Sequence, residues 1–185
     1  MSPIQHTPVT ASMKDDFTTH DGLILLTANR HKGIWATETR LKSGRRTRTA
    51  GQISTSASAH SLLVIGLTAA LKSISGRDIR KISRYRERKA RLRVISNDAT
   101  FSTALQALMK NDEAVIANVP LRAGKQFLRM LAKQLARFDI ELMTDLEDRS
   151  YSFQALKDWV QVHVRSPREQ ELLPAFMLPV VVSES

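Results

Sequence analysis

The stretch that decides the fold is residues 91–108, RLRVISNDATFSTALQAL. Apolar residues at 92, 94 and 95 indicate a buried strand, and apolar residues at 101, 104, 105 and 108 recur at helical spacing. Strand therefore passes into helix through Ser96-Asn97-Asp98. In α/β folds, ligands and metals bind at the carboxyl ends of strands. Asp98 is consequently a candidate ligand residue, and either Asp98 or Asn97 before it is a candidate helix N-cap.

Strands and helices are predicted on both sides of this unit. Apolar or alternating runs at 23–28, 34–41 and 45–53 are joined by short links, which indicates an antiparallel meander of three strands. A serine-rich start at 54–58 leads into a helix that ends near Gly76, and the basic stretch 77–89 is interpreted as a helix or an extended connection. The pattern then predicts a helix at 124–138, a strand at 140–143 and a helix at 151–164. We expect an α/β fold with a mixed five-stranded sheet, made of the meander plus two further strands and flanked by helices.

The 185 residues divide into an irregular N-terminal arm (1–21), one domain (22–164) and an apolar, proline-containing tail (165–185). The tail either folds over the domain or docks into a partner protein. There is no cysteine, and the five histidines show no ligand spacing, so we expect neither a metal nor another cofactor. No signal pattern or membrane-spanning run is present, which predicts a cytoplasmic protein without membrane contact.

The net charge of +10 is concentrated in one part of the chain. Residues 21–93 carry 17 Lys and Arg against four acids, whereas residues 94–185 carry 10 against 12. Clustered cations gain affinity for polyanions by releasing counterions from phosphates, so this half is predicted to bind nucleic acid. The candidate contacts are Arg40, Lys42, Arg45, Arg46, Arg48, Arg77, Arg80, Lys81, Arg84, Arg86, Arg88 and Lys89.

Several strings, in this order, resemble the ribonuclease H-like fold family. LLTAN (25–29) is similar to the family's first strand, and GQISTSASAHSLLVIGLTAALKSI (51–74) is similar to its third strand and first helix. VISNDATFSTALQAL (94–108) is similar to its fourth strand and the following helix, and GKQFLRMLAKQLARFDIELMT (124–144) is similar to the helix preceding its fifth strand. The resemblance covers roughly residues 22–164.

The resemblance implies a set of four acids that hold two Mg²⁺ ions for phosphodiester hydrolysis. The family's third acid falls on Asp98 and its fourth on Asp158, whereas the first falls on Ala28 and the second near Leu63, or on Ser61 if the register slips. Two carboxylates leave most of the charge of two metal ions uncompensated. We therefore expect no catalytic residues. The acids that remain for a different assembly are Glu38, Asp98, Asp145, Glu147, Asp148 and Asp158.

Three functional hypotheses follow. The leading one is a pseudoenzyme, a catalytically degenerate ribonuclease H-like domain that binds RNA or DNA through a basic face within a nucleoprotein complex. Trp35 and Tyr85 are candidates for base stacking, but aromatic residues make up only 5% of the chain, which favours phosphate contact. The alternative is a protein-interaction or regulatory subunit that docks through residues 165–185. The least favoured is an active metal-dependent nuclease.

Overall fold

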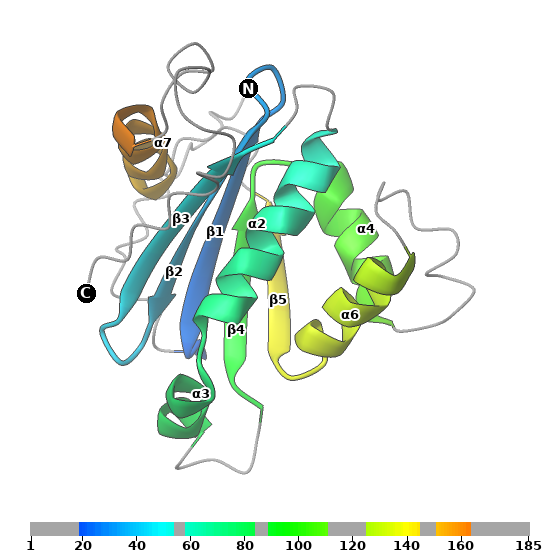
Figure 1. The fold of residues 1–185 in the computed structure, drawn as a ribbon. Coiled ribbons are helices and arrows are strands. Elements are labelled where there is room, and N and C mark those ends of the chain that lie inside the picture. Colours follow the sequence, from blue (N-terminus) through cyan, green and yellow to red (C-terminus); the bar gives the residue numbers. More distant parts are fainter. Residues whose placement is uncertain (1–18, 54–57, 84–88, 111–124, 145–150, 164–185) are drawn as a thin grey trace, which may run out of the picture.

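The computed structural model describes residues 19–53, 58–83, 89–110, 125–144 and 151–163. Within these ranges the chain forms a βββααβααβα sequence of elements (Figure 1). In order they are β1 (Gly22–Asn29), β2 (Ile34–Leu41), β3 (Arg46–Gln52), α2 (Ala59–Ser73), α3 (Gly76–Ser83), β4 (Arg91–Ser96), α4 (Ala99–Met109), α6 (Lys125–Leu135), β5 (Asp139–Thr144) and α7 (Tyr151–His163).

The strands form one mixed sheet in the order β3-β2-β1-β4-β5. The pairs β1–β2 and β2–β3 are antiparallel, and the pairs β1–β4 and β4–β5 are parallel. The prediction of a five-stranded mixed sheet, with a three-strand meander and two further strands, is confirmed. The basic stretch after α2, for which helix and extended connection were both open, begins as the helix α3.

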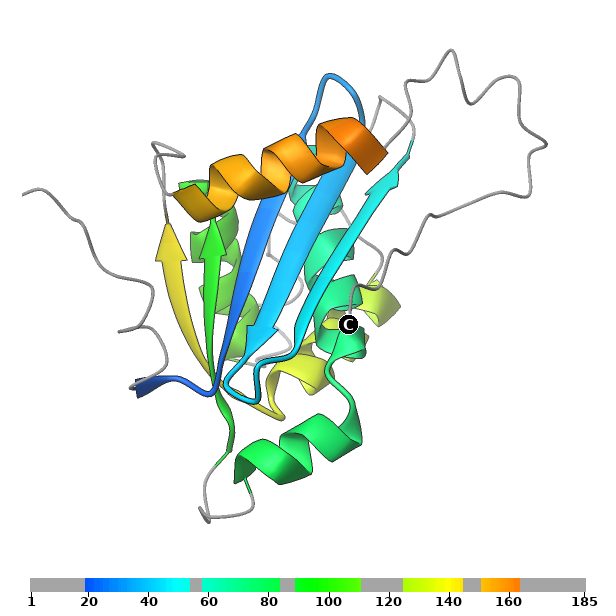
Figure 2. The ribbon, with the colours of Figure 1, turned by 90° about the vertical axis from the view of Figure 1, so that its left-hand side faces the viewer.

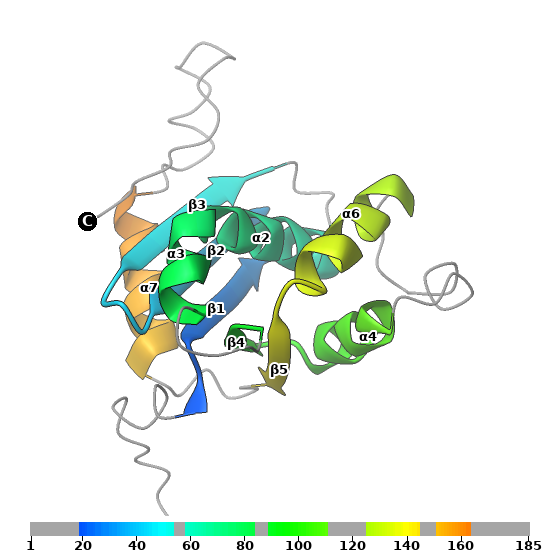
Figure 3. The ribbon, with the colours of Figure 1, turned by 90° about the horizontal axis from the view of Figure 1, so that it is seen from below.

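Helices cover both faces of the sheet. Figures 1 and 3 show α2, α4 and α6 on one face, and Figure 2 shows α7 lying across the other. Side chains alternate between the faces because the period of a strand is two residues. Ile24 and Leu26 of β1 accordingly pack in the core with α2, whereas Leu23 and Leu25 pack with α7.

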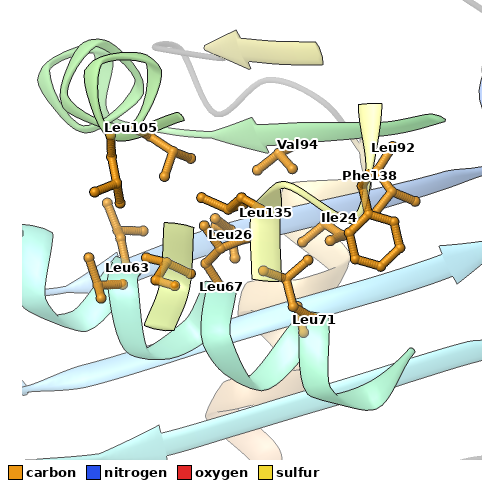
Figure 4. Close-up of a cluster of buried hydrophobic side chains, with 14 of the residues drawn as sticks. Ile24, Leu26, Leu63, Leu67, Leu71, Leu92, Val94, Leu105, Leu135 and Phe138 are labelled. Atoms are coloured by element: carbon orange, nitrogen blue, oxygen red, sulfur yellow. The ribbon is translucent and has the colours of Figure 1, made fainter. Parts of the chain in front are cut away.

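The larger core lies between the sheet and the three-helix layer (Figure 4). Leu63, Leu67 and Leu71 recur along α2 at a spacing of four residues and meet Leu92 and Val94 from the sheet. On the opposite face, Phe153, Leu156 and Trp159 of α7 pack on β1, β2 and β3. The apolar spacing of the sequence therefore matches the observed packing on both faces.

The structure describes only part of the two ends of the chain. Apart from residues 19–21, the predicted N-terminal arm lies outside the described residues, and so does the tail 165–185. Among the described helices, none is both long and apolar enough to cross a bilayer.

Candidate nucleic-acid interface

The β2–β3 hairpin and α3 lie side by side at the lower end of the sheet (Figures 2 and 3). An ion pair connects them, because Nη1 of Arg45 donates to Oδ2 of Asp78 at 2.5 Å. The same carboxylate oxygen accepts from the backbone N–H of Ser75 at 2.9 Å and from its hydroxyl at 2.6 Å. Cationic segments separated by 33 residues in the sequence are thereby held at one end of the molecule.

Exposed cations gather at this end, which we call the basic end. Asp78, the acid that faces Arg45 there, is 7% exposed. The predicted contacts Arg84, Arg86 and Arg88 lie outside the described residues, as does Tyr85. The basic end consists of Lys42, Arg45, Arg77, Arg80, Lys81 and Lys89, all of them exposed.

The other three arginines among the predicted contacts converge on one carboxylate. In the β2–β3 register Glu38 faces Arg48 and Arg40 faces Arg46, so all four side chains share the α7 side of the sheet. Nε of Arg40 donates to Oε1 of Glu38, whereas Arg46 and Arg48 donate to Oε2 at 2.9 and 2.6 Å. Glu38 is fully buried and Arg40 is 8% exposed, so the structure places Arg40 inside the protein and not on its exposed surface.

The ionisation of Glu38 follows from this geometry. Burial by itself raises the pKa of a carboxyl group, but hydrogen bonds from Arg46, Arg48 and Arg40 outweigh burial and hold the pKa of Glu38 below its ordinary value. Glu38 is consequently a buried carboxylate anion, paired with its arginines.

Asp98 lies at the opposite end of the sheet, where β4 ends and α4 begins. It is the N-cap of α4, since its Oδ1 accepts from the backbone N–H of Phe101 at 2.9 Å, which confirms the capping prediction. The same oxygen accepts from the hydroxyl of Thr100 at 2.7 Å and lies 3.5 Å from Nε2 of His60. Burial raises the pKa of Asp98, but the bonds from Thr100 and Phe101 and the nearby His60 lower it below its ordinary value overall.

The residue of α2 that reaches Asp98 is His60, not Leu63 or Ser61. Leu63, near which the family's second acid was predicted to fall, is 1% exposed and belongs to the hydrophobic core. α2 begins at Ala59, so His60 stands in its first turn and Leu63 follows just beyond that turn. The serine-rich helix start in the sequence is the signal from which this position could have been found.

Ala28 completes this corner of the sheet. Leu26 pairs with Ser96 at the end of the parallel register of β1 and β4, so Ala28 near the end of β1 and Asp98 just after β4 belong to the same edge of the sheet. We call this edge, with Ala28 near the end of β1 and with His60 beside Asp98 after β4, the strand-end corner. Asp158 is not part of it: this exposed residue of α7 accepts a hydrogen bond from Gln154 at 2.7 Å, on the other side of the sheet.

Base stacking by Trp35 and metal binding by the acids are the two remaining hypotheses from the sequence. Trp35 is 5% exposed and packs against Gly51, so it does not offer a face for base stacking. Within the described ranges, no three His, Asp or Glu side chains are grouped so that they could share a metal ion. Asp145, Glu147 and Asp148 lie outside those ranges.

A search of known protein families and a search of curated protein sequences found no match to this chain.

Proposed function

We propose that this chain is a degenerate ribonuclease H-like domain that binds nucleic acid through phosphate contacts at the basic end and does not cleave it. The strand order β3-β2-β1-β4-β5, with one antiparallel meander and two parallel additions, supports the fold assignment. The strand-end corner supports the loss of catalysis. The positions predicted for the first and second acids hold Ala28 and the core residue Leu63, and Asp98 is engaged in capping α4 with His60 beside it.

The observation that carries the proposal is the basic end itself. Hairpin and helix cations that are distant in sequence are joined there by the Arg45–Asp78 ion pair. Folding therefore brings exposed cations of two separate segments to the same end of the molecule. Such a surface attracts polyanions and binds them with a strong dependence on salt.

Phosphate contact is the mode of recognition that these residues favour. Lys and Arg bind backbone phosphates irrespective of base sequence, whereas sequence is read through contacts with base edges. Aromatic residues, which would supply stacking platforms, are scarce, and Trp35 is buried. Binding is consequently expected to be weakly sequence-specific.

A pair of matched double variants tests this proposal. Arg80→Glu/Lys81→Glu reverses two exposed charges at the basic end, and Arg30→Glu/Lys32→Glu reverses the same two residue types in the exposed β1–β2 turn at the opposite end. The measurement is fluorescence anisotropy of labelled single-stranded and duplex RNA and DNA in low salt. The first variant is expected to lose about tenfold in affinity or more, because two phosphate contacts become repulsive, and the second less than about twofold. Equal losses in both variants would refute a localised interface.

A further inference from the structure

We infer that Arg46 and Arg48 form a site for a single phosphate group on the α7 side of the sheet, beside Trp159. This site is separate from the basic end and does not require nucleic-acid binding there. The evidence is that the carboxylate of Glu38 accepts hydrogen bonds from several arginines at once.

Glu38 offers fewer acceptor positions than its arginines can use. Its Oε1 accepts from Arg40, which leaves Oε2 to serve both Arg46, through Nη2, and Arg48, through Nε. A guanidinium carries five N–H donors in a planar fork. In the described part of the structure, both Nη groups of Arg48 and the Nε and Nη1 groups of Arg46 make no hydrogen bond. These two arginines therefore have unused donors and together carry one positive charge more than the carboxylate they share.

The Arg48 side chain is held in place from the other side. Its guanidinium lies over the ring of Trp159, 5.9 Å from the ring centroid, and His163 stacks on the same ring at 4.8 Å. Arg48 is thus fixed between Glu38 and an aromatic surface, which lowers the entropic cost of binding a ligand. The indole N–H of Trp159 is buried and has no acceptor in the described structure, so an additional donor lacks a partner beside Arg48.

A phosphate group fits this combination of donors and charge. It presents several acceptor oxygens and carries one or two negative charges, and arginine binds it through paired N–H donors. A ligand can approach from the side of Arg46, whose side chain is 47% exposed, and can then reach Arg48, whose side chain is 15% exposed. The source of the group is either free phosphate or a phosphate of a nucleic-acid strand.

The first test is a titration with inorganic phosphate at constant ionic strength, followed by tryptophan fluorescence. The chain contains two tryptophans, so Trp35→Phe leaves Trp159 as the only reporter. We expect a saturable change that chloride does not produce. In this background Arg48→Gln should weaken phosphate binding about tenfold, whereas Arg45→Gln, which removes the same charge at the basic end, should leave it within about twofold. A non-saturable response, or equal losses in both variants, would overturn the site.

A second pair of variants distinguishes loss of the phosphate site from misfolding of the protein. Arg46→Gln changes a half-exposed side chain, and Arg48→Lys retains the positive charge but loses the planar fork. Both should remain folded by circular dichroism and should bind phosphate less tightly than the parent. Folded variants with unchanged phosphate affinity would show that the arginines serve Glu38 alone.

Oligonucleotides that differ only in a 5′-phosphate distinguish the sources. A preference for the phosphorylated strand that is lost in Arg48→Gln assigns the site to a strand end, and no preference alongside saturable phosphate binding assigns it to free phosphate. Phosphate binding without oligonucleotide binding would refute the proposed function and keep this site. Oligonucleotide binding that Arg48→Gln does not change, together with no phosphate binding, would refute this site and keep the proposed function.

Discussion

Glu38 holds together the buried polar cluster on the α7 side of the sheet. It is fully buried on a central strand and receives hydrogen bonds from three arginines, so its charge is compensated inside the protein. A buried ion pair adds little compared with an apolar pair of the same shape, but removal of one partner leaves buried charge without compensation.

Glu38→Gln is therefore expected to lower the free energy of unfolding by about 3–5 kcal/mol, because three guanidiniums would lose their common anion. Urea denaturation followed by circular dichroism measures this change. Asp158→Asn is the control, since Asp158 is exposed and should change stability by less than about 0.5 kcal/mol. A loss below about 1 kcal/mol in Glu38→Gln would contradict the structural role of this carboxylate.

The same residue predicts a pH dependence. The pKa of Glu38 is lower in the folded protein than its ordinary value of 4.5. The folded state thus binds fewer protons than the unfolded state, so the stabilisation is present above pH 4.5 and is lost as the pH falls through the lower, folded value. Urea midpoints measured from neutral pH down to about pH 3 should fall less steeply in Glu38→Gln than in the natural protein. Parallel curves would show that Glu38 does not titrate with unfolding.

The strand-end corner makes a different prediction at the residue scale. If Asp98 is the remaining acid of a dismantled site, Ala28→Asp at the position predicted for the first acid, combined with His60→Glu beside Asp98, should create a cluster of three carboxylates. Such a cluster binds divalent cations through oxygen ligands. Calorimetry with Mn²⁺ should detect binding to this variant, no binding to the natural protein, and a loss of binding when Asp98→Asn is added. A folded variant without Mn²⁺ binding would argue against the ribonuclease H-like assignment.

At the scale of elements, the Trp35 side chain of β2 packs close to β3 and to α2. A Cβ added at Gly51 of β3 would lie 2.7 Å from Cζ2 of this ring, and one added at Gly66 of α2 would lie 3.4 Å from Cε3. Glycine at position 51 thus allows the indole to lie flat against β3. The close contact explains why an aromatic residue that seemed available for stacking is in the core.

Gly51→Ala should destabilise the protein by about 1–3 kcal/mol, because the indole must move within a packed core. Trp35→Leu removes the clash, so the double variant should be more stable than the sum of the two single losses implies. Chemical denaturation of the four proteins measures this coupling. Gly76→Ala is the control, because a Cβ there meets no atom within 4 Å. An additive double variant would disprove the close packing of Trp35 on β3.

The elements show what the sequence could predict and what it could not. Apolar runs and alternating patterns predicted all five strands, and the bounds of β2 were predicted without error. Asp98 was recognised as an N-cap because capping is a local interaction. The partners of Asp98 and Glu38 depend on which strands and helices meet in space. The choice of His60 over Leu63, and the gathering of three arginines on Glu38, could therefore not be read from local patterns.

At the scale of the whole molecule, the basic end and the strand-end corner lie at opposite ends of the sheet. The basic end holds the exposed cations of the hairpin and α3, whereas Asp98 and His60 lie where β4 ends. A nuclease needs its cations where the scissile phosphate meets the metal ligands. This separation is what the proposed function, binding of nucleic acid without cleavage, requires.

The most direct test of this account is the salt dependence of nucleic-acid binding by the natural protein and by Arg80→Glu/Lys81→Glu. The dissociation constant for a labelled duplex is measured by anisotropy between 50 and 200 mM salt. We predict a steep linear fall of log affinity with log salt concentration, and a slope that is smaller by about two in the variant, because two phosphate contacts are lost. Affinity that does not change with salt, or a slope that the variant leaves unaltered, would contradict the account.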